Sequence, residues 1–321
     1  MTWAAWRVQR SQLVAGTLAV VVLLAWLAAT GLSTGHDPTW KYWTDGDLLV
    51  LEALPALLGL GLGAPLVAGE LRDATYRLAW TQGVAPRRWL TRRLLLGAGT
   101  VALLGAALSV LLGWWTSAVS LSPLSDSGGF TGFLIQPQGF DVTGLAPVAY
   151  GLFALCLGVV LGAWIGRPGW AFATGIPVYV LARLAIEDWV RPALLRPDDV
   201  AQLTGVGFVK ANSWVTHEGV VPLRHLAPLP GRPWSFTTPQ AYQACVAPIE
   251  RKNKSNLGAL AHCARAAHLH FVVQYQPASH YWPLQGAEAA IFLAAGAVLV
   301  ALSYLGLARR RADGGHGRSG R

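Results

Sequence analysis

Six stretches of mostly apolar residues follow one another along the chain, separated by polar connections. Each is about as long as the ~20 residues that an α-helix needs to cross the hydrocarbon core of a bilayer. They comprise residues 13–33, 48–69, 94–119, 144–165, 170–189 and 284–308. The pattern therefore predicts an all-α polytopic membrane protein with six transmembrane helices.

Composition supports this prediction. Of the 321 residues, 53% are hydrophobic and 13% are charged, and the mean hydropathy is +0.41. An ordinary soluble domain carries about 25% charged residues. The first apolar run exceeds the ~7–15 residues of a signal-peptide core, and further spans follow it, so we expect an uncleaved first helix. These features predict a multi-pass protein of the cell membrane.

Lys and Arg in the short connections indicate the orientation, because such connections stay in the cytoplasm. Residues 70–93 carry six arginines, and both termini are basic. The connection 121–143 has no Lys or Arg but contains Asp126 and Asp141, and residues 34–47 have Lys41 against three Asp. We therefore expect both termini inside the cell and residues 190–283 outside.

This topology predicts three parts. Residues 1–189 hold a flat N-terminal interfacial helix and the first five spans, residues 190–283 form the extracytoplasmic part, and residues 284–321 form the last span and the tail. Within the external part, the sequence favours a hairpin around Glu218 and Gly219, helices at 239–247 and 255–267, and a strand at 268–276. We expect a small mixed α/β insertion between the fifth and sixth helices.

The three cysteines divide in the same way. Cys156 lies inside the fourth span, where a small packing residue is expected. Cys245 and Cys263 both lie in the external part, 18 positions apart. In an oxidising compartment they can form a disulfide, whose loop closure is worth roughly 3 kcal/mol in the chain-entropy model. The alternative is two free thiols.

Several function classes are disfavoured. The net charge of +9 suggests nucleic acid, but the basic residues are spread over connections and termini, where orientation and anionic lipids account for them. His268 and His270 would share a strand face, yet a zinc site needs three or four ligands. The chain has no HExxH or GxSxG motif for an intramembrane hydrolase. We expect no nucleic-acid partner, no metal and no catalytic residue.

The connection between the second and third spans has the pattern of an amphipathic helix. From Glu70 onward its apolar residues recur at helical spacing, and charged or aromatic residues occupy the other face. Gly83 can end this helix and Pro86 can begin the next one. On these grounds alone, the segment is either a surface helix bound to lipid headgroups or a docking element.

A resemblance to a known family favours docking. Glu70, then Thr75, then Pro86 with Arg87 and Arg88, between the second and third of six spans, resembles the coupling region of type-2 (ABC-2) ABC exporter permeases. The stretches APLVAGELRDATYRLAWTQ and YQPASHYWPLQ are similar to stretches in actinobacterial permeases of this class. Ala74 stands where the class often has Gly.

This resemblance implies a permease that exports an amphipathic small molecule, a lipid or an antibiotic. A separate ABC ATPase subunit would bind ATP and Mg²⁺, since the chain has no GxxxxGK[ST] phosphate loop. Further partners would be a second permease copy or a sister permease, and membrane lipids. The alternative is a non-transporting sensor or immunity protein whose external part binds a ligand. The expected ATPase contacts are Glu70, Arg72, Asp73, Thr75, Tyr76, Arg77 and Trp80.

Charged residues at membrane depth form a second candidate site, because such residues are costly and usually paired or functional. All of them fall in one outer-leaflet layer if the spans alternate in direction. Arg183 and Glu187 can pair at i,i+4. The layer is either an interhelical clamp or an outer gate that contacts substrate. Its members are Glu52, Arg183, Glu187, Asp188 and Glu288.

Overall fold

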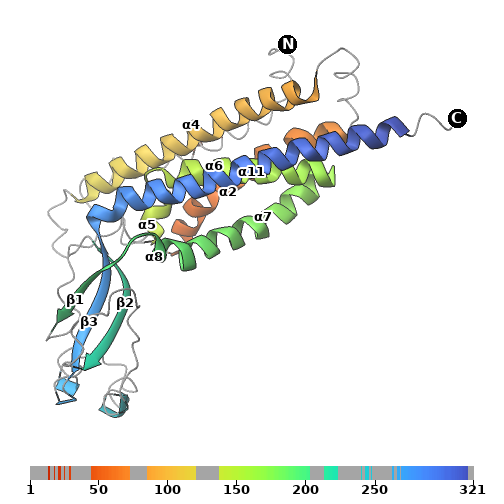
Figure 1. The fold of residues 1–321 in the computed structure, drawn as a ribbon. Helices are drawn as coiled ribbons and strands as arrows, with labels where there is room; N and C mark the ends of the chain where they lie inside the picture. The colour runs from red at the N-terminus through yellow and green to blue at the C-terminus, as the bar shows by residue number, and fades with distance from the viewer. Residues whose placement is uncertain are drawn as a thin grey trace.

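The computed structural model describes residues 45–72, 85–120, 137–202, 213–222 and 269–316, with separate positions between 14 and 29 and between 240 and 267. Long helices lie side by side in one bundle (Figure 1). A twisted sheet projects from one end of the bundle, and the carboxyl end of the last helix lies at the other end.

Five of the described helical segments are long and apolar enough to cross a membrane. They confirm the prediction of a multi-pass membrane protein. The predicted first span, 13–33, lies largely outside the described residues, although Val14 and Leu18 within it are helical. The five segments are built on α2 (Asp45–Arg72), α4 (Pro86–Ser120), α6 (Ala146–Ile165), α7 (Pro168–Ala185) and α11 (Tyr281–His316).

Helix α6 lies at the centre and packs tightly against α2. A Cβ atom on Gly63 of α2 would collide with the carbonyl oxygen of Leu155 on α6. A Cβ atom on Gly158 would lie 2.7 Å from the backbone nitrogen of Ala64. Small residues allow such close backbone approach between membrane helices, where van der Waals packing supplies much of the association energy.

The contacts along α6 show the directions of its neighbours. Gly97 of α4 lies near Leu155 and Gly105 lies near Val148, so α4 runs antiparallel to α6. On α11, Gln285 lies at the start of α6 and Gly306 lies near its end, so α11 runs parallel. Successive spans thus alternate in direction, as repeated membrane crossings require.

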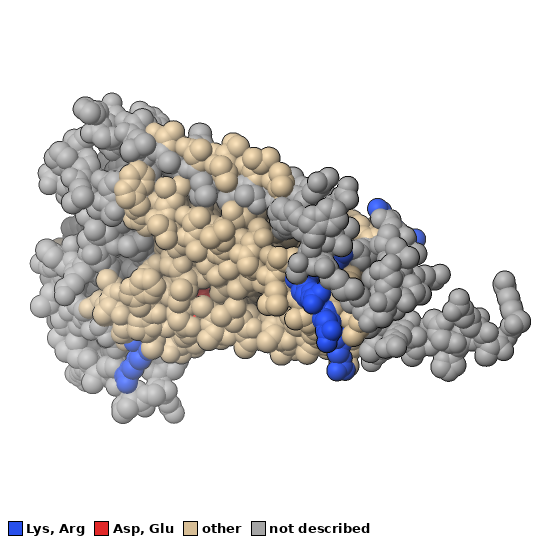
Figure 2. All heavy atoms as spheres, turned by 90° about the horizontal axis from the view of Figure 1, so that it is seen from above, with Lys and Arg blue, Asp and Glu red and all other residues tan. Residues whose placement is uncertain are grey.

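The outer surfaces of the helices suit a lipid environment. Leu103 and Val110 of α4 are 71% and 72% exposed, and such faces would form large apolar patches in water. Exposed tryptophans occupy both ends of the bundle, Trp170 at one and Trp189 and Trp282 at the other. Tryptophans favour the two membrane interfaces. Figure 2 shows a largely uncharged surface between two groups of Lys and Arg atoms, with a small patch of acidic atoms visible within it.

The fifth span is longer than predicted. After α7 ends at Ala185, the chain stays helical through a π-helical turn, η2 (Ile186–Val190), and the short helix α8 (Arg191–Leu194). The apolar segment therefore extends from Pro168 to Leu194. Before α6, the short helix α5 (Pro137–Val142) occupies part of the predicted connection 121–143.

The sheet has three antiparallel strands in the order β1-β3-β2. They are β1 (Asp198–Gln202), β2 (Ser213–Pro222) and β3 (Leu269–Pro277). Strand β3 confirms the strand expected at 268–276. It leads through the 3-10 turn η4 (Ala278–His280) directly into α11. Gln276 ties the sheet to the bundle, because its Nε2 donates to the Leu195 carbonyl at 2.9 Å.

The prediction of a hairpin around Glu218 and Gly219 is wrong. Both residues lie inside β2, where they pair with Val273 and Val272 of β3. A long partner strand keeps this stretch extended, and the irregularity appears instead as a register shift between Val215 and His217. Local turn chemistry was overridden by pairing with a strand more than 50 residues away.

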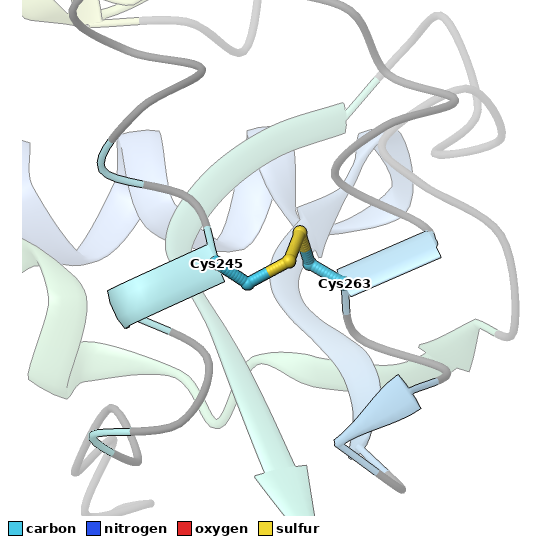
Figure 3. Close-up of a disulfide and its surroundings, with 2 residues drawn as sticks. All are labelled: Cys245 and Cys263. Atoms are coloured by element: carbon cyan, nitrogen blue, oxygen red, sulfur yellow. A yellow bond between two sulfur atoms is a disulfide. The ribbon is translucent and has the colours of Figure 1, made fainter.

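The disulfide prediction is confirmed. Cys245 and Cys263 are joined, with their Cα atoms 5.8 Å apart (Figure 3). Both cysteines lie at helical positions, as do the other described residues near them except Ala267, which is in a turn; this agrees with the expected helices. Cys156 is a half-buried free thiol of α6, and a Cβ atom on Gly296 of α11 would lie 3.5 Å from its sulfur.

Candidate functional site

A group of charged and phenolic side chains is buried between the helices at the sheet end of the bundle. We call it the buried charge cluster. Its carboxylates and guanidinium groups are between 1% and 8% exposed. The members are Asp141 of α5, Tyr150 of α6, Arg183 of α7, Arg191 of α8 and Glu288 of α11.

Gln285 of α11 holds the turn that carries Asp141 into the cluster. Its Oε1 accepts the backbone N–H groups of Leu145 and Ala146, both at 2.9 Å, which are free donors at the start of α6. Its Nε2 donates to the Phe140 carbonyl at 2.7 Å. Gly144 has a φ of +67°, a backbone conformation that favours glycine. This conformation lets the chain turn from α5 into α6.

The π-helical turn brings both arginines to one face. Eight residues along a regular α-helix would set Arg183 and Arg191 about 80° apart. A π turn inserts one extra residue, so Arg191 takes a phase about 20° from that of Arg183. Both guanidinium groups therefore reach Asp141, through contacts of 2.6 Å and 2.5 Å.

Arg191 makes the most extensive contacts in the cluster. Its Nε donates to Glu288 Oε2 at 2.7 Å, and its Nη2 lies 2.9 Å from Glu288 Oε1 and 2.5 Å from Asp141 Oδ1. The two-point contact with Glu288 is the geometry in which arginine binds a carboxylate most strongly. Its guanidinium also stacks over Phe140 at 4.5 Å.

Arg183 occupies the other side of Asp141. Its Nη2 donates to Asp141 Oδ2 at 2.6 Å, and it lies 3.8 Å from Glu187 one turn along the helix. Its guanidinium stacks over the Tyr150 ring at 4.2 Å. The Tyr150 hydroxyl lies 2.6 Å from Glu288 Oε1 and 3.1 Å from Asp141 Oδ1. Since it has one hydrogen, we assign that hydrogen to the shorter contact with Glu288.

The two arginines and two carboxylates at the centre of the cluster balance in charge. Buried ions are tolerated only when paired and hydrogen-bonded, and here each carboxylate contacts at least one guanidinium. The cluster therefore joins four stretches of chain, before α6, in α6, at the end of the fifth span and in α11. Such an arrangement can hold these helices in one register.

Only part of this site was predicted from the sequence. Arg183 and Glu288 lie in the cluster, and Glu187 lies at its edge. Asp188 is exposed, and no hydrogen bond or ion pair joins it to another described residue. Glu52 of α2 is half-buried, and no hydrogen bond or ion pair joins it to a described residue, although its charge interacts with that of Arg183.

Two residues of the buried charge cluster were predicted from the sequence to lie in external segments. Asp141 was expected in an external connection and is 2% exposed, because α5 folds against the bundle. Arg191 was expected at the start of the external part and is 1% exposed, because the π turn prolongs the fifth span. An arginine eight residues after Arg183, still within an apolar stretch, was the available signal for the second assignment.

The predicted ATPase contacts are placed only in part. Helix α2 extends to Arg72, which is exposed, and Glu70 occupies a helical position near its end. Helix α4 begins at Pro86, as expected, and Arg93 near its start donates to the Leu66 carbonyl of α2 at 3.2 Å. Asp73, Thr75, Tyr76, Arg77 and Trp80 lie outside the described residues.

Five long apolar helices define a multi-pass membrane protein, and the buried charge cluster joins three of these five segments, those of α6, α7–α8 and α11. Residues 32–191 match the family model described as ABC-2 membrane transporter related, which supports an ABC-2 type permease. The matched stretch contains the connection 70–93 and every cluster residue except Glu288. No curated protein and no solved structure matches the chain.

Proposed function

We propose that this chain is the membrane subunit of an ATP-driven exporter of the ABC-2 type. A separate ABC ATPase subunit binds ATP and Mg²⁺ and drives transport. The observation that carries the proposal is the match of residues 32–191 to ABC-2 membrane transporter related proteins, which includes the connection between α2 and α4. The helices that flank this connection support a role in force transfer.

Helices α2 and α4 are joined beside this connection. Arg93 of α4 donates to the Leu66 carbonyl of α2, and its guanidinium lies over the Trp89 ring at 4.8 Å. Leu90 packs in the same buried group as Leu66 and Val67. A force applied between Arg72 and Pro86 would therefore move both helices together.

The proposed ATPase contacts are Glu70, Arg72, Asp73, Thr75, Tyr76, Arg77 and Trp80. In this proposal the connection faces the cytoplasm, as do both termini, and the sheet with its disulfide lies outside the cell. Exposed Arg87, Arg88 and Arg92 at the start of α4 support this orientation, since basic residues favour the cytoplasmic side. The buried charge cluster then lies toward the outer leaflet.

The transport unit contains two permeases, either two copies of this chain or one copy with a sister permease, surrounded by lipids. ATP-driven closure of two ATPases rocks the permeases against each other. An amphipathic small molecule, a lipid or an antibiotic passes at their interface. Apolar helix faces such as that of Leu103 and Val110 support an amphipathic substrate.

The test is a pull-down of the tagged, detergent-solubilised protein from its native membrane, read by mass spectrometry. The wild type is expected to retain an ATP-binding subunit, which the Glu70→Ala/Arg77→Ala variant loses. The matched control is Asp188→Ala/Arg196→Ala, which removes the same two charge types from exposed positions at the opposite end of the bundle.

The control is expected to retain the ATPase as well as the wild type does. Loss of the ATPase from both variants would show a general folding defect rather than a lost contact. Absence of an ATPase from all three preparations would overturn the exporter proposal and favour a ligand-binding sensor or immunity protein.

A further inference from the structure

Helices α2 and α7 pack with a regular register that ends at two charged residues. A Cβ atom on Gly175 of α7 would lie 2.6 Å from the Leu60 side chain of α2. One turn further, Ala56 and Tyr179 belong to the same buried group. Because the two helices run in opposite directions, the next turn places Glu52 opposite Arg183.

The polar groups around this position are not matched with partners. Tyr179 is 4% exposed and Arg183 is 8% exposed, yet the Tyr179 hydroxyl and Arg183 Nη1 have no hydrogen-bond partner in the described part of the chain. Glu52 makes no hydrogen bond or ion pair with a described residue either, although it lies within electrostatic range of Asp141, Arg183 and Glu187 and of Tyr179. Buried polar groups without partners are costly and rare.

We propose that Glu52, Tyr179 and Arg183 form a subsite for a hydroxyl-bearing headgroup of an amphipathic substrate. A hydroxyl can donate to the Glu52 carboxylate and accept from Arg183 Nη1 or the Tyr179 hydroxyl. The half-buried position of Glu52 leaves one side of the subsite reachable from outside the bundle. This inference deepens the proposed function. That the bound molecule is transported rests on the proposed function, whereas its binding at this subsite does not.

Hydrogen-bonding capacity selects a hydroxyl over the two charged alternatives. An ammonium group would pair with Glu52 but has no acceptor, so Arg183 Nη1 would stay without a partner. A phosphate would accept from Arg183 and Tyr179 but would be repelled by Glu52. Only a neutral group that both donates and accepts satisfies all three side chains. The Tyr179 ring, 6.2 Å from that of Phe153, adds an aromatic wall.

The test compares three ligands that share a dodecyl chain: dodecyl glucoside, dodecylamine and dodecyl phosphate. The purified full-length protein is held in phosphatidylcholine nanodiscs without an ATPase. The thermal unfolding midpoint is followed by tryptophan fluorescence at increasing ligand concentration, since a ligand that binds the folded state raises it. Variants are Glu52→Leu and Tyr179→Phe, with Asp188→Asn as the exposed acidic control.

Dodecyl glucoside is expected to bind the wild type and the Asp188→Asn control most tightly of the three ligands. Tyr179→Phe, which keeps the ring, should weaken it about five- to tenfold, the effect of one lost hydrogen bond. Glu52→Leu should weaken it at least as much.

Two results would overturn the proposal. A preference for dodecylamine that disappears in Glu52→Leu would identify a cation site. Equal affinities in all proteins, with Glu52→Leu lowering the midpoint without ligand, would show that Glu52 serves as an internal partner of Arg183. Since no ATPase is present, neither result depends on the outcome of the pull-down.

Discussion

Arg191 and Glu288 show how single residues stabilise this bundle. Each is 1% exposed, and they meet through two hydrogen-bonded contacts between α8 and α11. A buried pair need not stabilise more than apolar residues of similar size would, because desolvating both ions is costly. Removing one partner is different, since it leaves the other charge buried.

We therefore predict that Glu288→Ala lowers stability by about 3–5 kcal/mol, the usual effect of leaving one member of a buried pair without its partner. Thermal unfolding of the purified protein in detergent, followed by tryptophan fluorescence, measures the change. Asp188→Ala provides the exposed control and should leave the midpoint unchanged. The double variant Arg191→Leu/Glu288→Leu should be more stable than Glu288→Ala. Equal midpoints for Glu288→Ala and the control would contradict the importance of the pair.

Spacing predicted the contact between Arg183 and Glu187, because one turn of helix separates them. Asp141 was not predicted in the cluster. It follows residues whose composition is that of an external connection, and only the packing of α5 and the hydrogen bonds of Gln285 show that it is buried. The residues that bury it and bind it lie between 9 and about 145 positions away along the chain, so no local pattern shows its burial.

At the scale of helices, the contact between α2 and α6 depends on glycine. Gly63 has its missing Cβ directed at the backbone of Leu155, whereas Gly61, on the same helix, has nothing within 4 Å of the equivalent position. The two glycines lie in the same helix but differ in what surrounds them. Substituting each by alanine therefore distinguishes the effect of helix packing from the effect of intrinsic helix propensity.

Gly63→Ala is expected to destabilise the protein by about 1–3 kcal/mol, because α2 and α6 must move apart to admit the methyl group. Gly61→Ala should be neutral or slightly stabilising, since alanine favours helix over glycine by about 1 kcal/mol. Thermal unfolding in detergent measures both. A larger loss for Gly61→Ala than for Gly63→Ala would argue against the close approach of the two helices.

Strand and helix boundaries were predicted unevenly. The long apolar helices follow from hydropathy, since almost every residue in them carries the signal. The sheet depended on pairing, because β2 could have turned at Glu218 and Gly219 if β3 had not been available as its partner. The π turn at Ile186–Val190 has no hydropathy signal at all.

At the scale of the whole molecule, the orientation is testable through the cysteines. If the sheet end lies outside the cell, Cys245 and Cys263 can be reduced from outside. In intact cells, a membrane-impermeant reductant followed by PEG-maleimide should label both, with no labelling before reduction. Cys156 should stay unlabelled, because it is half-buried within a membrane span.

The variant Cys245→Ser/Cys263→Ser is the control and should take up no label. Labelling that requires permeabilised cells would place the disulfide-bearing segment in the cytoplasm. That result would reverse the proposed orientation and would exclude the connection between α2 and α4 as a cytoplasmic docking element.

The sequence by itself determined that this protein spans the membrane several times and where five of its helices lie, whereas it left the pairing of Cys245 and Cys263 open against two free thiols. These properties are local or depend on composition, because each apolar stretch must cross the bilayer as a hydrogen-bonded helix. Only the tertiary structure decided which charges meet. Asp141, Arg191 and Glu288 come from stretches far apart in the chain, and a one-residue change of helical phase at the π turn determines whether Arg191 faces the cluster or the lipid.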